Sequence, residues 1–366
     1  MHITKQLKFC NSKSLKIANF VSCLKLKNMV LVTGATGFLG AHLLIELLNN
    51  NQNIRAIKRE NSDLNFVKKI FSYYHQDVDY LYKKIEWVDA DVMDIFSLED
   101  AMQGVDKVYH CAAVVSFSPN DKKLLFDTNV KGTANVVNTA LRMQIKKLCF
   151  VSSIAAIGRS ENNQQTTEET EWKSSKRNSN YAVSKYNAEM EVWRGIEEGL
   201  NAVIVNPSVI LGPGDWKNGS AKIFDTLGKG SKFYTEGVNG FVDVRDVAKV
   251  MFLLMESEII NERFIVSSEN LSYRELFTLI LKAYHMKAPH IEAPRILLEL
   301  FWRFERIRGN LFNIRPLITR ETVNTSQSKY YYSTEKLQKA IGFQFKPVAD
   351  IINFTAKQYL NENCNK

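Results

Sequence analysis

At 366 residues the chain can bury a large core, and its 45% hydrophobic and 24% charged residues are ordinary for a globular protein. The net charge of +9 gives weak support to a nucleic-acid partner, because six of the excess lysines fall within residues 1–28, which hold no acidic residue. No stretch approaches the ~20 apolar residues that a membrane span needs. We therefore predict neither a nucleic-acid partner nor a membrane span.

The first 28 residues are basic and partly apolar, so a targeting or membrane-surface segment is one interpretation. They lack, however, an uninterrupted apolar run followed by a small-residue cleavage site, and they contain no arginine of the transit-peptide kind. We expect instead a disordered extension, or an upstream start codon with Met29 as the true beginning.

A glycine-rich run follows the first predicted strand, 29–32, and precedes an apolar helical segment at 41–48. Its glycines allow a sharp turn, a close approach of the backbone to a pyrophosphate, and tight packing of the helix on the strand. The helix N-terminus adds partial positive charge for the phosphates. This order predicts a dinucleotide site with six candidate residues: Gly34, Thr36, Gly37, Phe38, Leu39 and Gly40.

Short apolar strands alternate with helical segments from residue 30 to about residue 205, and a late strand is predicted at 262–266. This alternation is typical of a parallel sheet covered by helices on both faces. We predict an α/β fold: a doubly wound parallel sheet (Rossmann) with a smaller, mainly helical C-terminal substrate lobe. The remaining predicted strands are 54–57, 85–88, 107–111, 147–151 and 201–205.

The predicted domain organisation follows this pattern. A dinucleotide-binding domain covers 29–205, and 241–267 return to it. The substrate lobe consists of 206–240 and 268–366. No internal repeat is evident, and the chain is predicted to be mainly helical from residue 271 onward.

Three segments depart from the regular alternation. Residues 159–180 form a polar loop rich in Glu, Asn, Thr and Ser, and residues 211–240 contain seven glycines, which exclude a single regular element. Residues 291–312 combine bulky apolar and basic side chains, which would suit a surface helix that touches lipid or lines an apolar substrate site. Core packing of a small lobe is the preferred interpretation of that stripe.

Tyr181 and Lys185 open a predicted helix, and their spacing of four residues puts them on one face. A tyrosine with an ordinary pKa of ~10 holds its proton too firmly for exchange near neutral pH. A neighbouring ammonium favours the phenolate and lowers that pKa. A helix with an incidental Tyr and Lys would show the same spacing. This pair, however, follows a fifth predicted strand that ends in Ser152 and Ser153, and that position favours a nicotinamide-dependent enzyme.

Cysteine and histidine patterns give no metal site. The five cysteines are odd in number, scattered and without paired ligand spacing, so we interpret them as reduced thiols of a cytoplasmic protein. The six histidines form no HExxH or similar cluster, and we expect them to be structural.

The succession of motifs resembles the extended short-chain dehydrogenase/reductase family, within the NAD-dependent epimerase/dehydratase superfamily, from about residue 30 to residue 342. The resemblance implies an NAD(P)-dependent oxidoreductase. The matching pieces are TGATGFLG at 33–40, Asp91-Val92, His110-Cys111-Ala112-Ala113, Asn129-Val130-Lys131-Gly132-Thr133, Val151-Ser152-Ser153, YAVSK at 181–185, Asn206-Pro207 and FVDVRDVA at 241–248.

The resemblance also implies roles for these residues. Tyr181 would be the general acid/base, Lys185 its activator and a ribose ligand, and Ser153 the hydroxyl that holds the substrate carbonyl. Ser152 is the less favoured candidate for that last role, and Asn129 would brace the active-site helix. Tyr181, like Lys185, would also contact the cofactor. Further implied cofactor contacts are Asp91 and Val92 at the adenine, Ala112 and Ala113 along the cleft, and Pro207, between Asn206 and Ser208, beside the nicotinamide.

The cofactor preference depends on the end of the second strand, where an acidic residue would bind the adenosine 2′-OH and a basic residue the 2′-phosphate. Lys58 and Arg59 lie there and match the arginine of reductases similar to dihydroflavonol reductase. NADP(H) is therefore favoured over NAD(H). Glu60 follows directly and would reverse this preference if the loop register shifted by one residue.

The type of reaction is indicated by departures from the sugar-modifying branches of the family. The dehydratases carry Thr-Asp-Glu where this chain has Ile154-Ala155-Ala156, and the 4-epimerases typically show Tyr-Gly and Arg-Pro where it has Ile157-Gly158 and Asn206-Pro207. These departures resemble dihydroflavonol-reductase-like and 3β-hydroxysteroid-dehydrogenase-like members, which favours reduction of a small-molecule carbonyl or oxidation of an alcohol.

Two other interpretations stay open. Nucleotide-sugar epimerisation by transient oxidation is the alternative. A non-catalytic dinucleotide-binding protein ranks third, because such proteins often lose the Tyr/Lys pair. The sequence does not name the substrate, and a homodimer is common in the family.

Overall fold

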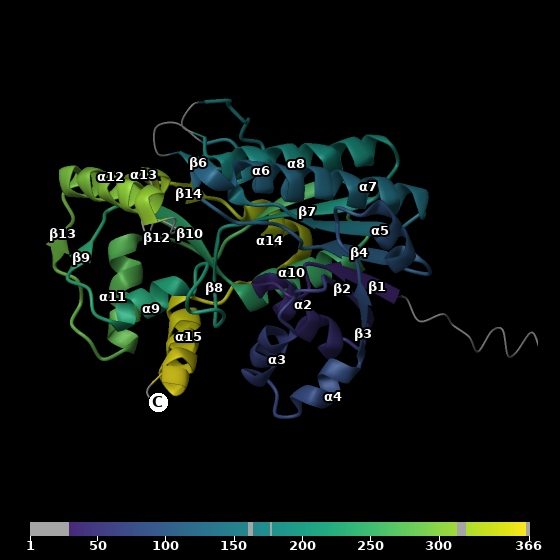
Figure 1. The fold of residues 1–366 in the computed structure, drawn as a ribbon, viewed down its shortest axis with the longest axis horizontal. Coiled ribbons are helices and arrows are strands. Elements are labelled where there is room, and N and C mark those ends of the chain that lie inside the picture. The colour runs from purple at the N-terminus through teal and green to yellow at the C-terminus, as the bar shows by residue number, and fades with distance from the viewer. Residues whose placement is uncertain (1–28, 160–163, 176–177, 313–319, 364–366) are drawn as a thin grey trace, which may run out of the picture.

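A seven-stranded parallel sheet forms the centre of the protein, whose computed structural model describes residues 29–159, 164–175, 178–312 and 320–363 (Figure 1). The predicted extension 1–28 lies outside the described residues. The strand order is β11-β7-β5-β4-β1-β2-β3, and every neighbouring pair is parallel. The strands are β1 (Met29–Thr33), β2 (Asn53–Lys58), β3 (Ile85–Asp89), β4 (Lys107–His110), β5 (Lys147–Val151), β7 (Ala202–Pro207) and β11 (Glu262–Val266).

Helices cover both faces of this sheet, as Figure 1 shows, with α7 and α8 on one side and α2 and α10 on the other. Each face therefore has its own apolar core, as expected for strands that are buried on both faces. The helices on the α2 face are α2 (Phe38–Asn49), α3 (Leu64–Ser72), α4 (Val78–Lys83) and α10 (Val244–Glu256). Those on the other face are α5 (Ile95–Met102), α7 (Gly132–Arg142) and α8 (Asn180–Glu197). The predicted doubly wound α/β fold is confirmed.

A smaller unit with its own core lies beside the main sheet. Its three-stranded sheet has the order β12-β10-β8, and a third apolar cluster joins it to three helices. Its elements are β8 (Val209–Leu211), β10 (Val238–Asp243), β12 (Glu269–Ser272), α9 (Lys222–Gly228), α11 (Tyr273–Ala283) and α15 (Val348–Asn363). Residues 241–243, which we assigned to the segment that returns to the dinucleotide-binding domain, lie within β10 and pair in this smaller sheet. The return to the main sheet therefore begins with α10.

The segments that connect the main strands and helices contain short strands and short helical turns. The polar loop before α8 contains β6 (Gln165–Thr166), which pairs with β14 (Tyr331–Tyr332), so this loop is attached to a distant part of the chain. Before α7 the chain passes through η1 (Pro119–Asp121), α6 (Lys122–Leu125) and the π-helix η2 (Phe126–Lys131), and η3 (Ile154–Ala156) follows β5. The other elements are β9 (Phe233–Tyr234), β13 (Ile291–Glu292), α13 (Arg320–Gln327) and α14 (Glu335–Ile341).

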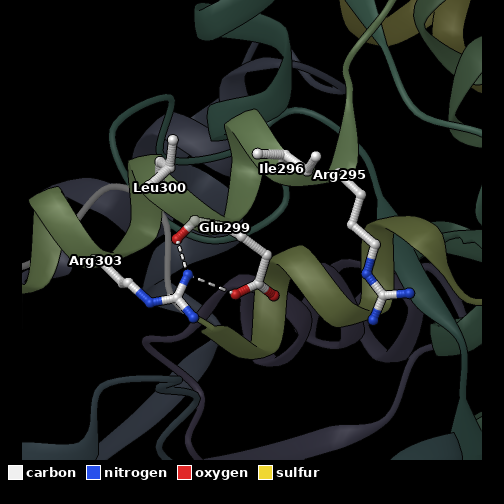
Figure 2. Close-up of a pocket in the computed structure, with 5 residues that line it drawn as sticks. All are labelled: Arg295, Ile296, Glu299, Leu300 and Arg303. Atoms are coloured by element: carbon white, nitrogen blue, oxygen red, sulfur yellow. Dashed lines mark hydrogen bonds and ion pairs between the residues drawn. The ribbon is translucent and has the colours of Figure 1, made fainter.

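Helix α12 (Arg295–Phe312) does not follow the interpretation preferred from the sequence, which was core packing of segment 291–312. Six of its large apolar side chains are at least two-fifths exposed: Ile296, Leu297, Leu300, Phe301, Phe304 and Ile307. A shallow pocket runs along the helix, and Figure 2 shows Glu299 and Arg303 turned toward one another there, away from Ile296 and Leu300. The apolar stripe is real, but it faces outward. Among the helices that the structure describes, none combines the length and apolar character that crossing a bilayer requires.

Candidate active site

The glycine-rich run forms the turn between β1 and α2, and two of its glycines are required by close contacts. Gly34 has φ +66°, and a Cβ there would lie 2.6 Å from the backbone nitrogen of Ala112. A Cβ on Gly40 would lie 2.1 Å from the carbonyl oxygen of Gly34. Both approaches are to backbone atoms, which cannot swing aside as a side chain would. These glycines hold the first turn of α2 against the ends of β1 and β4.

The N-terminus of α2 is open to a ligand. Gly37 is its N-cap residue and no side chain caps it, while its first turn holds no acidic residue. The first backbone N–H groups of a helix have no partner within the helix and attract anions. A cavity of about 760 Å³ lies beside this turn and is lined by Thr36 and Phe38, by residues of α3 and by part of the loop 215–221. This end of the helix is therefore suited to hold phosphate groups.

The residues expected to meet the adenosine lie directly after β2 and β3. Lys58 is ion-paired with Asp89 on the neighbouring strand, whereas Arg59 is exposed at the start of a tight turn. The Met93 backbone N–H donates to Asp91 Oδ1 at 2.9 Å, and the Val92 side chain is buried. Among the ion pairs of the described residues, none involves Arg59, so its guanidinium is available to an anionic ligand.

Beyond β4, His110 is a structural residue. It is almost fully buried, its Nδ1 lies 2.7 Å from Thr33 Oγ1, and its Nε2 lies 3.0 Å from Thr133 Oγ1. Burial, and then the charge of Lys185, lower its pKa to about 3, so the ring is neutral. The Ala112 backbone N–H donates to Thr33 Oγ1 at 3.2 Å, which fixes the start of the Ala112-Ala113 segment. In the described part of the chain no group of His, Cys, Asp and Glu has a metal-binding arrangement.

Helix α8 begins at a Ser179 cap, whose Oγ accepts the Ala182 N–H at 2.9 Å. Tyr181 is half-buried in the first turn, with its ring edge-to-face against Phe117 at 5.7 Å between centroids. One turn later Lys185 is 2% exposed; its Nζ donates to the Val151 carbonyl at 2.7 Å and lies 4.5 Å from the centroid of the Phe150 ring. The pair shares one face of α8, at the carboxyl end of β5.

The charge on Lys185 is finely balanced. Burial lowers the pKa of its ammonium to about 8, and the negative charge of Glu189 opposes that effect. The Cys111 thiol is itself neutral, because burial raises its pKa to about 12. Lys185 therefore changes its charge near the neutral range, where a proton-transfer partner is useful.

The two serines after β5 differ in their contacts. The Ser152 hydroxyl is buried and donates to Glu189 Oε2 at 2.5 Å. Ser153 Oγ accepts the Ala155 N–H at 3.1 Å as the cap of η3, so its own hydroxyl hydrogen is not used in that bond. The two serines therefore differ in their hydrogen bonds: the Ser152 hydroxyl is used by the buried Glu189, whereas the Ser153 hydroxyl hydrogen is not used in the cap and is available to a ligand.

Asn129 contacts helix α8, which agrees with the bracing role that the family resemblance implies. Its Nδ2 donates to Ser184 Oγ at 3.0 Å and to the Val114 carbonyl at 3.0 Å, while its Oδ1 accepts the Val114 N–H at 2.7 Å. It lies in the π-helix η2, a feature that apolar periodicity does not reveal. π-helical segments are frequent at functional sites.

Sequence reasoning missed Glu189. This carboxylate has no exposed surface, and it accepts hydrogen bonds from Ser152, Asn206, Arg263 and Trp193. Its spacing of four residues from Lys185 was the available signal, because Tyr181, Lys185 and Glu189 follow one another along one face of the helix.

Three comparisons with known proteins bear on this site. Residues 30–266 match the model of a family described as "NAD dependent epimerase/dehydratase family". The chain is 30% identical to sterol demethylase protein B of Methylococcus capsulatus over 273 residues, and this aligned region covers 74% of this chain and 78% of that protein. It is 30% identical over 319 residues to a Synechocystis protein named provisionally as a dihydroflavonol 4-reductase, with 85% and 88% covered. The crystal structure of UDP-glucose 4-epimerase from Thermotoga maritima has the same fold, with a TM-score of 0.72 at 20% identity over 91% of this chain and 99% of that chain.

Proposed function

The chain belongs to the NAD dependent epimerase/dehydratase family, and we propose that it is a reductase or dehydrogenase that moves a hydride between nicotinamide C4 and the carbonyl or alcohol carbon of a small molecule. It is an NAD(P)-dependent oxidoreductase, in line with its reductase-named relative. The observation that carries the proposal is the position of Lys185 on helix α8, one turn after Tyr181. The buried Lys185 donates a hydrogen bond to the carbonyl of Val151, the last residue of β5, and Ser153 follows Val151 by two positions.

The carboxyl edge of the sheet fits a dinucleotide on structural grounds. Gly34 and Gly40 leave no room for a Cβ, and the N-terminus of α2 has no capping side chain. At the other end of the edge, among the described residues, Asn206 Oδ1 and Ser208 Oγ are buried without a hydrogen-bond partner. Buried polar atoms are nearly always paired, so these two fit a polar group such as a carboxamide. A bound nicotinamide would supply the hydride at C4.

The protein's own residues would handle the proton. In the direction of reduction, Tyr181 Oη donates its proton to the substrate oxygen as the carbonyl carbon is reduced, and it takes the proton back in the direction of oxidation. Lys185 stabilises the phenolate that forms, because its ammonium lies on the same helical face. Ser153 donates its hydroxyl hydrogen to the same substrate oxygen and polarises the carbonyl.

We propose NADP(H) as the preferred cofactor. Arg59 supports this preference because it is exposed directly after β2, while Lys58 is held by Asp89. A guanidinium binds a 2′-phosphate through two parallel hydrogen bonds, which a 2′-hydroxyl does not offer.

The test has two parts. Mass spectrometry under gentle conditions identifies any nucleotide that copurifies, and a screen of ketones and aldehydes then measures NADPH oxidation. Saturable oxidation of NADPH with at least one carbonyl supports the proposal. Retained cofactor with no net change in nicotinamide absorbance, together with conversion of a nucleotide sugar, would instead support epimerisation. Cofactor binding with no activity on either panel would support a binding protein.

Four further points belong to the proposal. The sequence predicts a cofactor domain of 29–205 and 241–267 and a substrate lobe of 206–240 and 268–366; because residues 241–243 pair in the smaller sheet, we propose that the returning segment begins with α10 at residue 244. A cytoplasmic location agrees with the two free cysteines of the described residues, Cys111 and Cys149. Light scattering will show whether a homodimer forms.

A further inference from the structure

Glu189 is a charged side chain with no exposed surface on the active-site helix. Its Oε2 accepts from Ser152 Oγ at 2.5 Å and from Asn206 Nδ2 at 2.8 Å. Its Oε1 accepts from Arg263 Nη1 at 3.0 Å and from Trp193 Nε1 at 3.4 Å. Burial of a carboxylate is costly unless it is paired and hydrogen-bonded, and this one has both kinds of partner.

The partners of Glu189 outside its own helix come from three neighbouring strands and the residue that follows one of them. Ser152 follows β5, Asn206 lies in β7 and Arg263 in β11, and these three strands are adjacent in the main sheet. The residues Glu189 and Arg263 are 74 positions apart in sequence, so the contact exists only in the folded chain. Glu189 therefore ties α8 to the part of the sheet edge where we propose that the substrate binds.

Two short connections lead from Glu189 to the proposed chemistry. Asn206 Nδ2, which donates to Glu189, also donates to the Ser153 carbonyl oxygen at 3.0 Å, so the backbone that carries the Ser153 hydroxyl is fixed through one intermediate residue. In the other direction, Glu189 lies one helical turn from Lys185 and its negative charge favours the ammonium.

A third connection leads to the loop that precedes α8. The Arg263 guanidinium, paired with Glu189, also donates from Nε to the Glu168 carbonyl at 3.0 Å, and Glu168 Oε1 accepts the Ile265 N–H at 2.7 Å. The buried carboxylate is thus the shared acceptor of a network that includes the loop, the helix and three strands. A purely stabilising role does not require such a network, since apolar side chains of similar volume usually stabilise a core at least as well.

We propose that Glu189 is a positioning residue for the reaction: through Asn206 it fixes Ser153, and through its charge it keeps Lys185 in the ammonium form beside Tyr181. This inference rests on the proposed function for its catalytic part. The other groups near Lys185 are His110 and Cys111 after β4, which are neutral, and Phe150 and the Val151 carbonyl of β5. On its other side, Glu189 is ion-paired with Arg263 at 3.0 Å.

The test compares Glu189→Gln and Glu189→Asp with a matched control. Glu191→Gln removes the same charge from the same helix, where Glu191 is paired with the partly exposed Arg194. The first readout is the titration of Lys185, followed by the chemical shift of its ¹³Cε in lysine-labelled protein and assigned with Lys185→Arg. The second is the pH profile of kcat, with KM for NADPH.

We expect Glu189→Gln to move the Lys185 titration to lower pH and the alkaline limb of the kcat profile with it. At neutral pH kcat should fall by about ten- to a hundredfold, because Ser153 loses its alignment, with KM for NADPH changed by less than about threefold. Glu189→Asp should restore the titration in part, and Glu191→Gln should leave both readouts at the wild-type values.

An unchanged Lys185 titration and an unchanged kcat profile in Glu189→Gln would overturn the inference, as would equal effects of Glu191→Gln. If Glu189→Gln does not fold because Arg263 is left unpaired, the double variant Glu189→Gln/Arg263→Met removes both charges and is measured in the same way. A wild-type protein without carbonyl reductase activity would refute the proposed function, whereas the Lys185 titration would still decide whether Glu189 controls that charge.

Discussion

Helices α8 and α12 each span 18 residues, but they differ in which large side chains they expose, although α12 also buries one charged group, Glu305. α8 buries two charged groups, Lys185 and Glu189, inside the protein. α12 exposes large apolar groups instead: Ile296 is 76% exposed and Phe304 is 61% exposed. On α12 the charged Glu299 and Arg303 pair with each other on the surface (Figure 2).

The difference between the two helices depends on whether neighbouring elements supply hydrogen-bond and packing partners. The charges of α8 are buried because residues of β5, β7 and β11, and Ser152 after β5, provide donors and acceptors. Such burial is costly unless each group is satisfied. The apolar groups of α12 remain exposed although their burial would be favourable. A costly feature that the fold maintains points to function at α8, and the predictions below test that contrast.

The strongest test is Tyr181→Phe. Loss of the phenolic proton should lower kcat by about a hundred- to ten-thousandfold, since general acid/base catalysis contributes that much. Cofactor binding, measured by quenching of protein fluorescence, should stay close to wild type because the ring and its contact with Phe117 remain. The control is Tyr186→Phe on the same helix, whose ring stacks on Trp172. Wild-type turnover in Tyr181→Phe would remove the basis for assigning catalysis to α8.

A second test concerns charges that are exposed and not buried. Arg59→Ala should weaken NADPH binding by about ten- to a hundredfold, because hydrogen bonds to charged groups are worth about 1.5–3 kcal/mol, and should hardly change NADH binding. Titration calorimetry with both nucleotides measures this. Lys58→Ala is the control, since Lys58 is already paired with Asp89 and should affect both nucleotides weakly. Equal losses for NADPH and NADH in Arg59→Ala would argue against NADP(H) preference.

The buried Lys185 predicts a pH dependence. Because its pKa is about 8 and we propose the ammonium as the active form, kcat should fall by about tenfold per pH unit above that value. The folded-state pKa lies below the ordinary value of 10.5, so the unfolded chain binds more protons between the two. The penalty of burying the charge is therefore complete below about pH 8 and disappears as the pH rises toward 10.5.

Two measurements check this pH dependence. A kcat profile locates the alkaline limb. Urea unfolding should show that the stability of the wild type relative to Lys185→Met rises between pH 7 and pH 10. A stability difference that stays flat or falls over that range would contradict the assignment of Lys185 as a buried ammonium.

The smallest effect is expected on α12. Leu300→Ala should change the free energy of unfolding by less than about 0.5 kcal/mol, because the side chain is already 60% exposed. Val192→Ala on α8 should cost about 1–2 kcal/mol, because Val192 is fully buried. Denaturant unfolding of the two variants compares the helices directly. A larger loss for Leu300→Ala would show that α12 buries that face in solution.

Much of the fold follows from local pattern. The apolar segments at 54–57, 147–151 and 262–266 form β2, β5 and β11. Short apolar runs between helical segments are typical of the buried strands of an α/β protein. Gly34 and Gly40 were recognisable because tight turns and close packing exclude a side chain. The spacing of Tyr181 and Lys185 sufficed to put them on one face of a helix.

Other features could not be read from the chain. The orientation of α12 depends on which elements pack against it, so an apolar stripe predicted burial that the structure does not show. The difference between Ser152 and Ser153 arises from Glu189 and from the turn η3, and the π-helix around Asn129 has no apolar period of its own.

By itself, then, the sequence determined the order of the strands in the main sheet and of the helices between them, the turn that suits phosphates and the shared face of the Tyr/Lys pair, since each depends on residues within a few positions of one another. The smaller sheet β12-β10-β8 was not predicted. The tertiary structure decided which groups meet at the sheet edge. Glu189 reaches Arg263 and Asn206 across 74 and 17 positions, and only the parallel packing of β5, β7 and β11 brings them within hydrogen-bond distance.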